Sequence, residues 1–109
     1  SSHPDHIAAG EATLSSVYPT ARDRLTFPEL LEEGFEPHKV REVWVMSRED
    51  ADHFNEITEK DMGTAMNALA AHTSQVPPEA IERVKAWKSE NGKNHDMKYA
   101  ESFRTFTLR

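Results

Sequence analysis

The chain has 109 residues, which is enough for one small domain and too few for two domains of ordinary size. Its 13 lysines and arginines against 19 aspartates and glutamates give a formal charge of −6, which argues against nucleic acid and against an anionic membrane surface as partners. The absence of cysteine excludes disulfides, thiolate metal ligands and cysteine nucleophiles, and the absence of a secretory signal or a long apolar run predicts a cytoplasmic protein.

The first predicted element is a helix near the N-terminus. Pro4 suits the first turn of a helix, so Ser2 or His3 is expected at the N-cap. Asp5 then lies where a carboxylate favours the helix dipole. Apolar residues continue at helical spacing over residues 7–21.

A proline and a glycine delimit the next segments. Pro19 is expected to end the first helix or to kink it near Tyr18. Residues 22–39 are predicted to be a connection with one short helical turn, which begins near Pro28 and ends at Gly34.

Two strands are predicted in the middle of the chain. Residues 40–47 form a near-continuous apolar run, which indicates burial on both faces, as in the middle of a parallel sheet. Residues 53–58 alternate weakly and predict a short edge strand. A buried parallel strand needs neighbours for its backbone groups. We therefore expect sheet neighbours that the pattern does not reveal, or strands supplied by another polypeptide.

The third quarter of the chain predicts two helices. Thr58 and Asp61 have the spacing of a capping box before a helix whose Met62 and Met66 are expected in the core. A second helix is expected to begin at Pro77-Pro78 and to stop in a left-handed turn at Asn91-Gly92.

The end of the chain and the aromatic residues complete the prediction. Residues 96–103 are expected to form a last helix, and residues 105–108 a short terminal strand. Large aromatic side chains are expected to anchor the core or to face the sheet, namely Tyr18, Trp44, Phe54, Trp87 and Phe103.

The sequence His3-Pro4-Asp5-His6 is the constellation with the clearest chemical character. His3 and His6 are three residues apart, so one helical turn brings their imidazoles to the same side. The positive end of a helix disfavours protonated imidazole, and neutral imidazole is both a metal ligand and a proton acceptor. Asp5 can orient either ring. The alternative is a polar cap with no chemical role.

The segment His3-Pro4-Asp5-His6-x-Ala-Ala-Gly resembles the second motif of the LmbE-like, PIG-L family of zinc-dependent de-N-acetylases. Four further segments look like that family in the same order: residues 40–46, 53–58, 68–75 and 99–104. The resemblance implies an α/β fold with a Rossmann-like parallel sheet. It also implies hydrolysis of the acetamide of an N-acetylglucosamine unit attached to a small aglycone.

The resemblance also implies roles for individual residues. His6 would be a zinc ligand, His3 would stabilise the oxyanion and act as general acid, and Asp5 would hydrogen-bond and tune His3. Zinc would supply a nucleophilic water and polarise the amide carbonyl. The hydrolase would thus use His3 and Asp5 in catalysis and His6 for the metal.

One departure from the family is specific. The family's first motif, His-Pro-Asp-Asp, supplies two more zinc ligands and the general base, and it does not occur in these 109 residues. A catalytic zinc normally needs three protein ligands. We therefore expect residues 1–109 to be a single partial domain, the C-terminal half of a deacetylase, which needs its N-terminal half and is inactive alone.

Two other interpretations stay open. The first is a non-catalytic interaction or assembly module on the same scaffold, with the histidines as remnants. The second is a small independent metal-binding protein. An in-frame His-Pro-Asp-Asp upstream of Ser1 decides for the enzyme, and a start codon there decides for the module. An unpaired strand would also favour a homo-oligomer.

Overall fold

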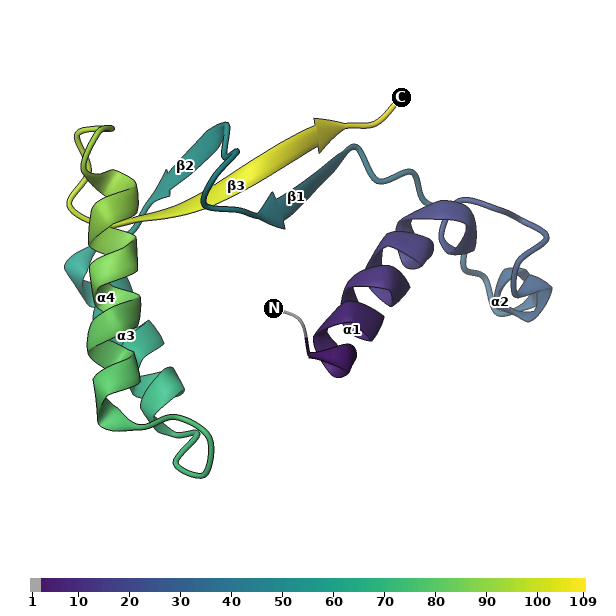
Figure 1. The fold of residues 1–109 in the computed structure, drawn as a ribbon. Helices are drawn as coiled ribbons and strands as arrows, with labels where there is room; N and C mark the ends of the chain where they lie inside the picture. The colour runs from purple at the N-terminus through teal and green to yellow at the C-terminus, as the bar shows by residue number, and fades with distance from the viewer. Residues whose placement is uncertain (1–2) are drawn as a thin grey trace. The chain divides into compact units, whose positions relative to one another are not determined.

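The computed structural model describes residues 3–109, a mixed α/β chain (Figure 1). In chain order the elements are α1 (Pro4–Ser15), η1 (Ser16–Thr20), α2 (Pro28–Glu32), β1 (Glu42–Met46), β2 (His53–Glu56), α3 (Glu59–Ala70), α4 (Pro78–Gly92) and β3 (Ala100–Thr107). Contacts separate the chain into two units. The terminal unit comprises residues 3–43 and 107–109, and the central unit comprises residues 44–106. The single partial domain expected over residues 1–109 stays a prediction.

The first helix of the terminal unit lies where the sequence predicts it. His3 is the N-cap of α1, and Ser2, the other cap candidate, lies outside the described residues. The segment η1 joins two helical pieces across a kink at Tyr18, whose backbone is extended (φ −155°, ψ 129°), next to Pro19, as predicted. Tyr18 is 63% exposed, so its expected role as a core anchor is wrong. It lies beside Arg22, whose guanidinium carbon is 5.7 Å from the ring centroid.

The short helix α2 also follows its sequence signals. It begins at Pro28 and is closed by Gly34, whose φ of +91° is the left-handed conformation that glycine adopts without strain. The amide of Phe35 donates to the Leu30 carbonyl (2.9 Å), which completes the helix end. The connection is then tied back to η1, because the amide of His38 donates to the carbonyl of Ala21 (2.7 Å).

The three strands among the described residues form one antiparallel sheet with the order β1-β3-β2. In the β2–β3 pair, His53 lies opposite Phe103 and Glu56 opposite Ala100. The amide of Ser47, just after β1, donates to the Ser102 carbonyl (3.2 Å). The expectation that residues 40–47 are buried on both faces of a parallel sheet is therefore wrong. β1 is an edge strand, and its neighbour is supplied by this chain.

The neighbour was missed because residues 96–103 were predicted to be helical, and this prediction is wrong. Residues Ala100–Thr107 form β3, the central strand, with Ala100 and Ser102 buried on one face. Small residues at every second position are compatible with a strand, but only pairing with both neighbours favours it over a helix.

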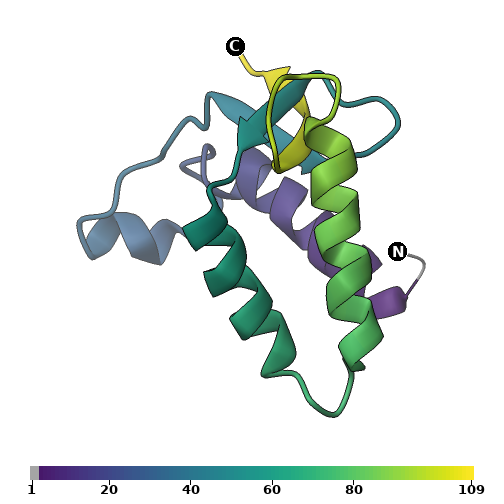
Figure 2. The same ribbon diagram turned by 90° about the vertical axis from the view of Figure 1, so that its left-hand side faces the viewer.

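The core lies in the central unit. Ile57, Met62 and Met66 are buried, and four partly buried residues pack against them: Leu69, Ile81, Val84 and Tyr99. α3 and α4 contact each other; α4 lies in front of α3 in Figure 1, and the two helices lie next to each other in Figure 2. The predicted capping box of α3 is confirmed, with Thr58 and Asp61 exchanging side-chain to main-chain hydrogen bonds. The predicted burial of both methionines is confirmed as well.

The end of α4 differs from the sequence prediction. Asn91 and Gly92 lie within the helix, so the predicted left-handed stop is wrong, and the positive φ of this region (57°) is at Asp96. Gly92 is buried, and a Cβ on it would lie 2.3 Å from the carbonyl oxygen of Met97. Glycine is required here for close packing of the following loop.

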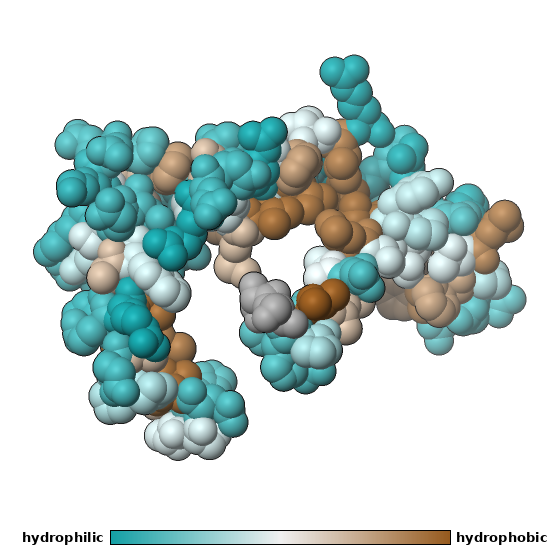
Figure 3. All heavy atoms as spheres, in the orientation of Figure 1, coloured by the Kyte–Doolittle hydropathy of each residue, from teal (hydrophilic) through white to brown (hydrophobic). Residues whose placement is uncertain are grey.

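Many hydrophobic side chains are exposed in both units. In the terminal unit Ile7 is 51% and Leu14 is 55% exposed, and in the central unit Met46 is 82% exposed. Hydrophobic atoms are visible on the surface over the strands (Figure 3). The expected anchors Trp44 and Trp87 are not core residues, although Trp44 packs on the sheet residue Phe103 with ring centroids 5.3 Å apart. No helix within residues 3–109 has the length and apolar character needed to span a membrane.

Candidate functional site

The candidate site is the first turn of α1. His3 has extended backbone (φ −66°, ψ 132°), and its carbonyl accepts the amides of His6 (3.0 Å) and Ile7 (3.1 Å). Pro4 follows at the first helical position, where a missing N–H costs nothing. The sequence therefore sets the helix start by local means, and the position of His3 relative to His6 follows from that start.

The two imidazoles lie on the same side of this turn. The ring centroids of His3 and His6 are 5.6 Å apart, and the ring planes are tilted by 44°. Both side chains are exposed to solvent. This arrangement agrees with the three-residue spacing that predicted it.

The contact between Asp5 and His3 uses the main chain. The amide of Asp5 donates to Nδ1 of His3 at 3.1 Å. The carboxylate Oδ2 of Asp5 is 4.0 Å from the same Nδ1, which is an ion-pair distance and too long for a hydrogen bond. Because Nδ1 accepts an N–H, the neutral His3 ring carries its proton on Nε2. The helix start thus selects the tautomer of His3.

The ligand atoms that His3 and His6 offer decide whether the start of α1 could hold a zinc ion. His6 offers an imidazole of the type zinc prefers, whereas Nδ1 of His3 is engaged by the Asp5 amide. Within residues 3–109 no group of three or more histidine and acidic side chains lies close enough to hold a metal. The described residues therefore fit one ligand position of a zinc centre and do not form a complete centre.

Outside this site, the carboxylate of Asp52 is the acid whose pKa is displaced. The main-chain amide of Thr105 donates to it (2.9 Å), which lowers its pKa, and the Thr105 hydroxyl (3.0 Å) and Arg104 lower it further. Asp52 thus joins the turn before β2 to β3, a contact that no local pattern in the sequence indicates.

Lys98 is a second group with a displaced pKa, and it connects two other segments of the central unit. Lys98 pairs with Glu59, and the hydrogen bond to this carboxylate raises the pKa of Lys98. Both side chains are mostly exposed, so this pair is a surface tie between the start of α3 and the loop before β3.

Comparison with protein-family models and with curated proteins finds no match to this chain. The family resemblance therefore depends on the motifs in the sequence alone.

Proposed function

We propose that this chain supplies the His3–Asp5–His6 portion of a zinc-dependent N-deacetylase. The substrate is an N-acetylglucosamine unit on a small aglycone, and the reaction is hydrolysis of its acetamide. The proposal is carried by one observation. The start of α1 presents two imidazoles 5.6 Å apart on one side of a turn, in a motif that resembles the family's second motif.

His6 is the zinc ligand in this proposal. Its imidazole is exposed and lies in the first turn of α1, and neutral imidazole is the form that binds a metal. Zinc, when bound, supplies Lewis acidity to the acetamide carbonyl. The other ligands and the general base come from an N-terminal half that lies outside these 109 residues.

His3 is the general acid and steadies negative charge on the substrate oxygen. To act as general acid, His3 donates from Nε2 as the imidazolium, because loss of a proton from the neutral ring would leave an imidazolate. In the imidazolium Nδ1 also carries a proton, so it releases the Asp5 amide that it accepts in the neutral ring. In the neutral ring, this main-chain donor of Asp5 holds the orientation of the imidazole. The Asp5 carboxylate lies 4.0 Å from Nδ1 and faces the position of the second ring proton in the imidazolium.

The proposed partner is the missing half of the same domain. β1 is an edge strand of the described sheet, and Met46 at its end is 82% exposed, which is unfavourable for a protein working alone. In the complete domain, strands of the N-terminal half pair with β1 and extend the sheet toward the Rossmann-like arrangement. We further propose that the assembled enzyme is cytoplasmic.

The first test is the coding sequence upstream of Ser1, where an in-frame His-Pro-Asp-Asp motif about one half-domain earlier is expected. The second test is acetate release from N-acetylglucosaminides by the polypeptide that contains both motifs. His6→Ala is expected to abolish zinc retention and turnover. His3→Ala is expected to retain zinc and to lower turnover by roughly 10²- to 10⁴-fold, the contribution of a general acid.

The control is His72→Ala, which removes an exposed imidazole whose residue makes main-chain hydrogen bonds at the end of α3. This variant should keep both zinc and turnover. The purified 109-residue chain is expected to release no acetate. Chelator-sensitive activity of the chain alone would contradict the need for a second half, and loss of turnover without loss of zinc in His6→Ala would contradict its role as a ligand.

A further inference from the structure

The candidate site lies at the start of α1, and a basic pocket lies at the opposite end of the helical segment formed by α1 and η1. It has a volume of about 670 Å³ and is formed by η1, the connection before β1 and the last residues of the chain. This volume is in the range of pockets that hold small molecules. His6 is about 15 Å away along the helix, from the rise per residue. The pocket shares no residue with the candidate deacetylase site.

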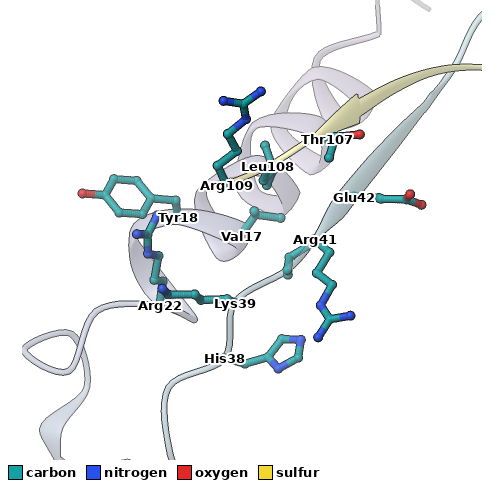
Figure 4. Close-up of a pocket in the computed structure, with 11 residues that line it drawn as sticks. Val17, Tyr18, Arg22, His38, Lys39, Arg41, Glu42, Thr107, Leu108 and Arg109 are labelled. Carbon is teal, nitrogen blue, oxygen red and sulfur yellow. The ribbon is translucent and has the colours of Figure 1, made fainter.

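The middle of the pocket is apolar. Val17 of η1 and Leu108 after β3 lie near the centre of the group in Figure 4, and Val40 also lines the cavity. The Leu108 amide donates to the carbonyl of Arg41 (2.8 Å), which holds the chain end against the connection. An apolar surface of this kind fits the body of an organic molecule better than a bare ion.

Cationic side chains surround this apolar centre. Arg22 and Lys39 lie to its left in Figure 4, Arg109 above it and Arg41 below it. No ion pair within residues 3–109 involves any of these four, whereas Arg24, Lys98 and Arg104 each have an acidic partner. Glu42 is the one acidic side chain among the lining residues. In a chain of net charge −6, four cations against one carboxylate around one cavity are a local excess of positive charge that an anion would offset.

We propose that this pocket binds a small organic phosphomonoester. Its ring or apolar body lies on Val17 and Leu108, and Arg22, Lys39 and Arg41 receive the phosphate. A phosphomonoester carries about −1.5 to −2 charges at pH 7, which suits several cations better than a single carboxylate does. One guanidinium group can bind two phosphate oxygens at once, through two parallel N–H···O hydrogen bonds. A long polyanion is disfavoured by the acidic chain outside the pocket.

The test uses the full 109-residue chain with phenyl phosphate, inorganic phosphate and phenol as probes, titrated by calorimetry at low salt. Phenyl phosphate is expected to bind saturably, about tenfold more tightly than inorganic phosphate, and phenol to show no binding. Amide chemical shifts should move within residues 17–22, 38–42 and 107–109. Added salt should weaken the binding.

Charge-matched variants separate the pocket from general electrostatic attraction. The double variant Arg22→Gln/Lys39→Gln should weaken phenyl phosphate at least about tenfold, because hydrogen bonds to charged groups are lost. The control Lys60→Gln/Arg83→Gln removes the same charge from exposed positions of the central unit and should change the affinity less than about twofold. His6→Ala should leave phenyl phosphate binding unchanged, so this proposal and the deacetylase proposal fail independently.

Three results would overturn the proposal. The first is the absence of saturable phenyl phosphate binding by the unaltered chain. The second is equal weakening in the pocket variant and in the control variant. The third is inorganic phosphate binding as tightly as phenyl phosphate, which would leave the apolar centre without a role.

Discussion

The two units of this chain differ most clearly in burial. Every buried residue among those described lies in the central unit, including Ile57, Met62, Met66 and Ala100. The terminal unit, over residues 3–43 and 107–109, has none. The central unit is therefore held by hydrophobic packing, whereas the terminal unit is held by helix ends, turns and main-chain hydrogen bonds. Packing of an apolar core contributes far more stability than such local contacts.

This difference matters because the candidate site and the basic pocket both lie in the unit without a core. Regions with few buried contacts are the ones that open first in native proteins, and binding segments are often drawn from them. A ligand or a partner that covers the terminal unit would stabilise it by binding only the folded form. The predictions below test whether stability is as unevenly distributed as burial is.

The largest expected loss of stability comes from truncating a buried methionine of the core. Met62 is 2% exposed, so Met62→Ala should lower the free energy of unfolding of the central unit by about 2–5 kcal/mol. Leu14→Ala in the terminal unit should cost less than about 0.5 kcal/mol, because Leu14 is already half exposed. Urea denaturation followed by circular dichroism measures both. Equal losses would mean that Leu14 is buried in solution and that the comparison fails.

A second pair of variants concerns glycine. Gly92→Ala should cost about 1–3 kcal/mol, because the new Cβ would meet the main chain at Met97 and force it to move. Gly10→Ala in α1 has open space around it and should be neutral or stabilising by up to about 1 kcal/mol. Thermal unfolding and helix content report these changes. A destabilising Gly10→Ala would indicate that something packs closely on α1.

Helix caps give a smaller contrast between the units. Thr58→Ala removes one of the two reciprocal hydrogen bonds of the α3 capping box and should cost about 1 kcal/mol. His3→Ala removes the side-chain cap contact with the Asp5 amide, at an exposed end of α1, and should cost less. Amide exchange of the first-turn N–H groups, measured by NMR, tests the order. Faster exchange at α1 than at α3 is expected in the unaltered chain.

The smallest effect is the pH dependence from Asp52. Its pKa is lowered in the folded state, chiefly by the Thr105 amide, so the contact stabilises the folded state above the unfolded pKa of about 4. This contribution is lost as the pH falls through the lower folded pKa. The urea midpoint of the central unit should decrease below about pH 4, and Asp52→Asn should flatten part of that decrease. Asp23→Asn, in the terminal unit, is the control and should leave the profile of the central unit unchanged.

The local signals in the sequence were sufficient for most helices and for the candidate site. Pro4, the Thr58–Asp61 pair and Pro78 mark the starts of α1, α3 and α4. The three-residue spacing of His3 and His6 placed their rings together, because a helical turn has a fixed geometry. The hydrogen bond from the Asp5 amide to His3 was not predicted, since it depends on the cap conformation of one residue.

Non-local features required the tertiary structure. Residues 100–107 form a strand because β1 and β2 pair with them on either side, and neither partner is near them in the sequence. The sequence alone determined where helices begin and where two imidazoles share a turn, since these depend on residues within about four positions. Only the tertiary structure decided which strand is central, why Gly92 must be glycine, and that cations at positions 22, 39, 41 and 109 line one pocket. Those outcomes depend on long-range contacts, whose partners a local pattern does not specify.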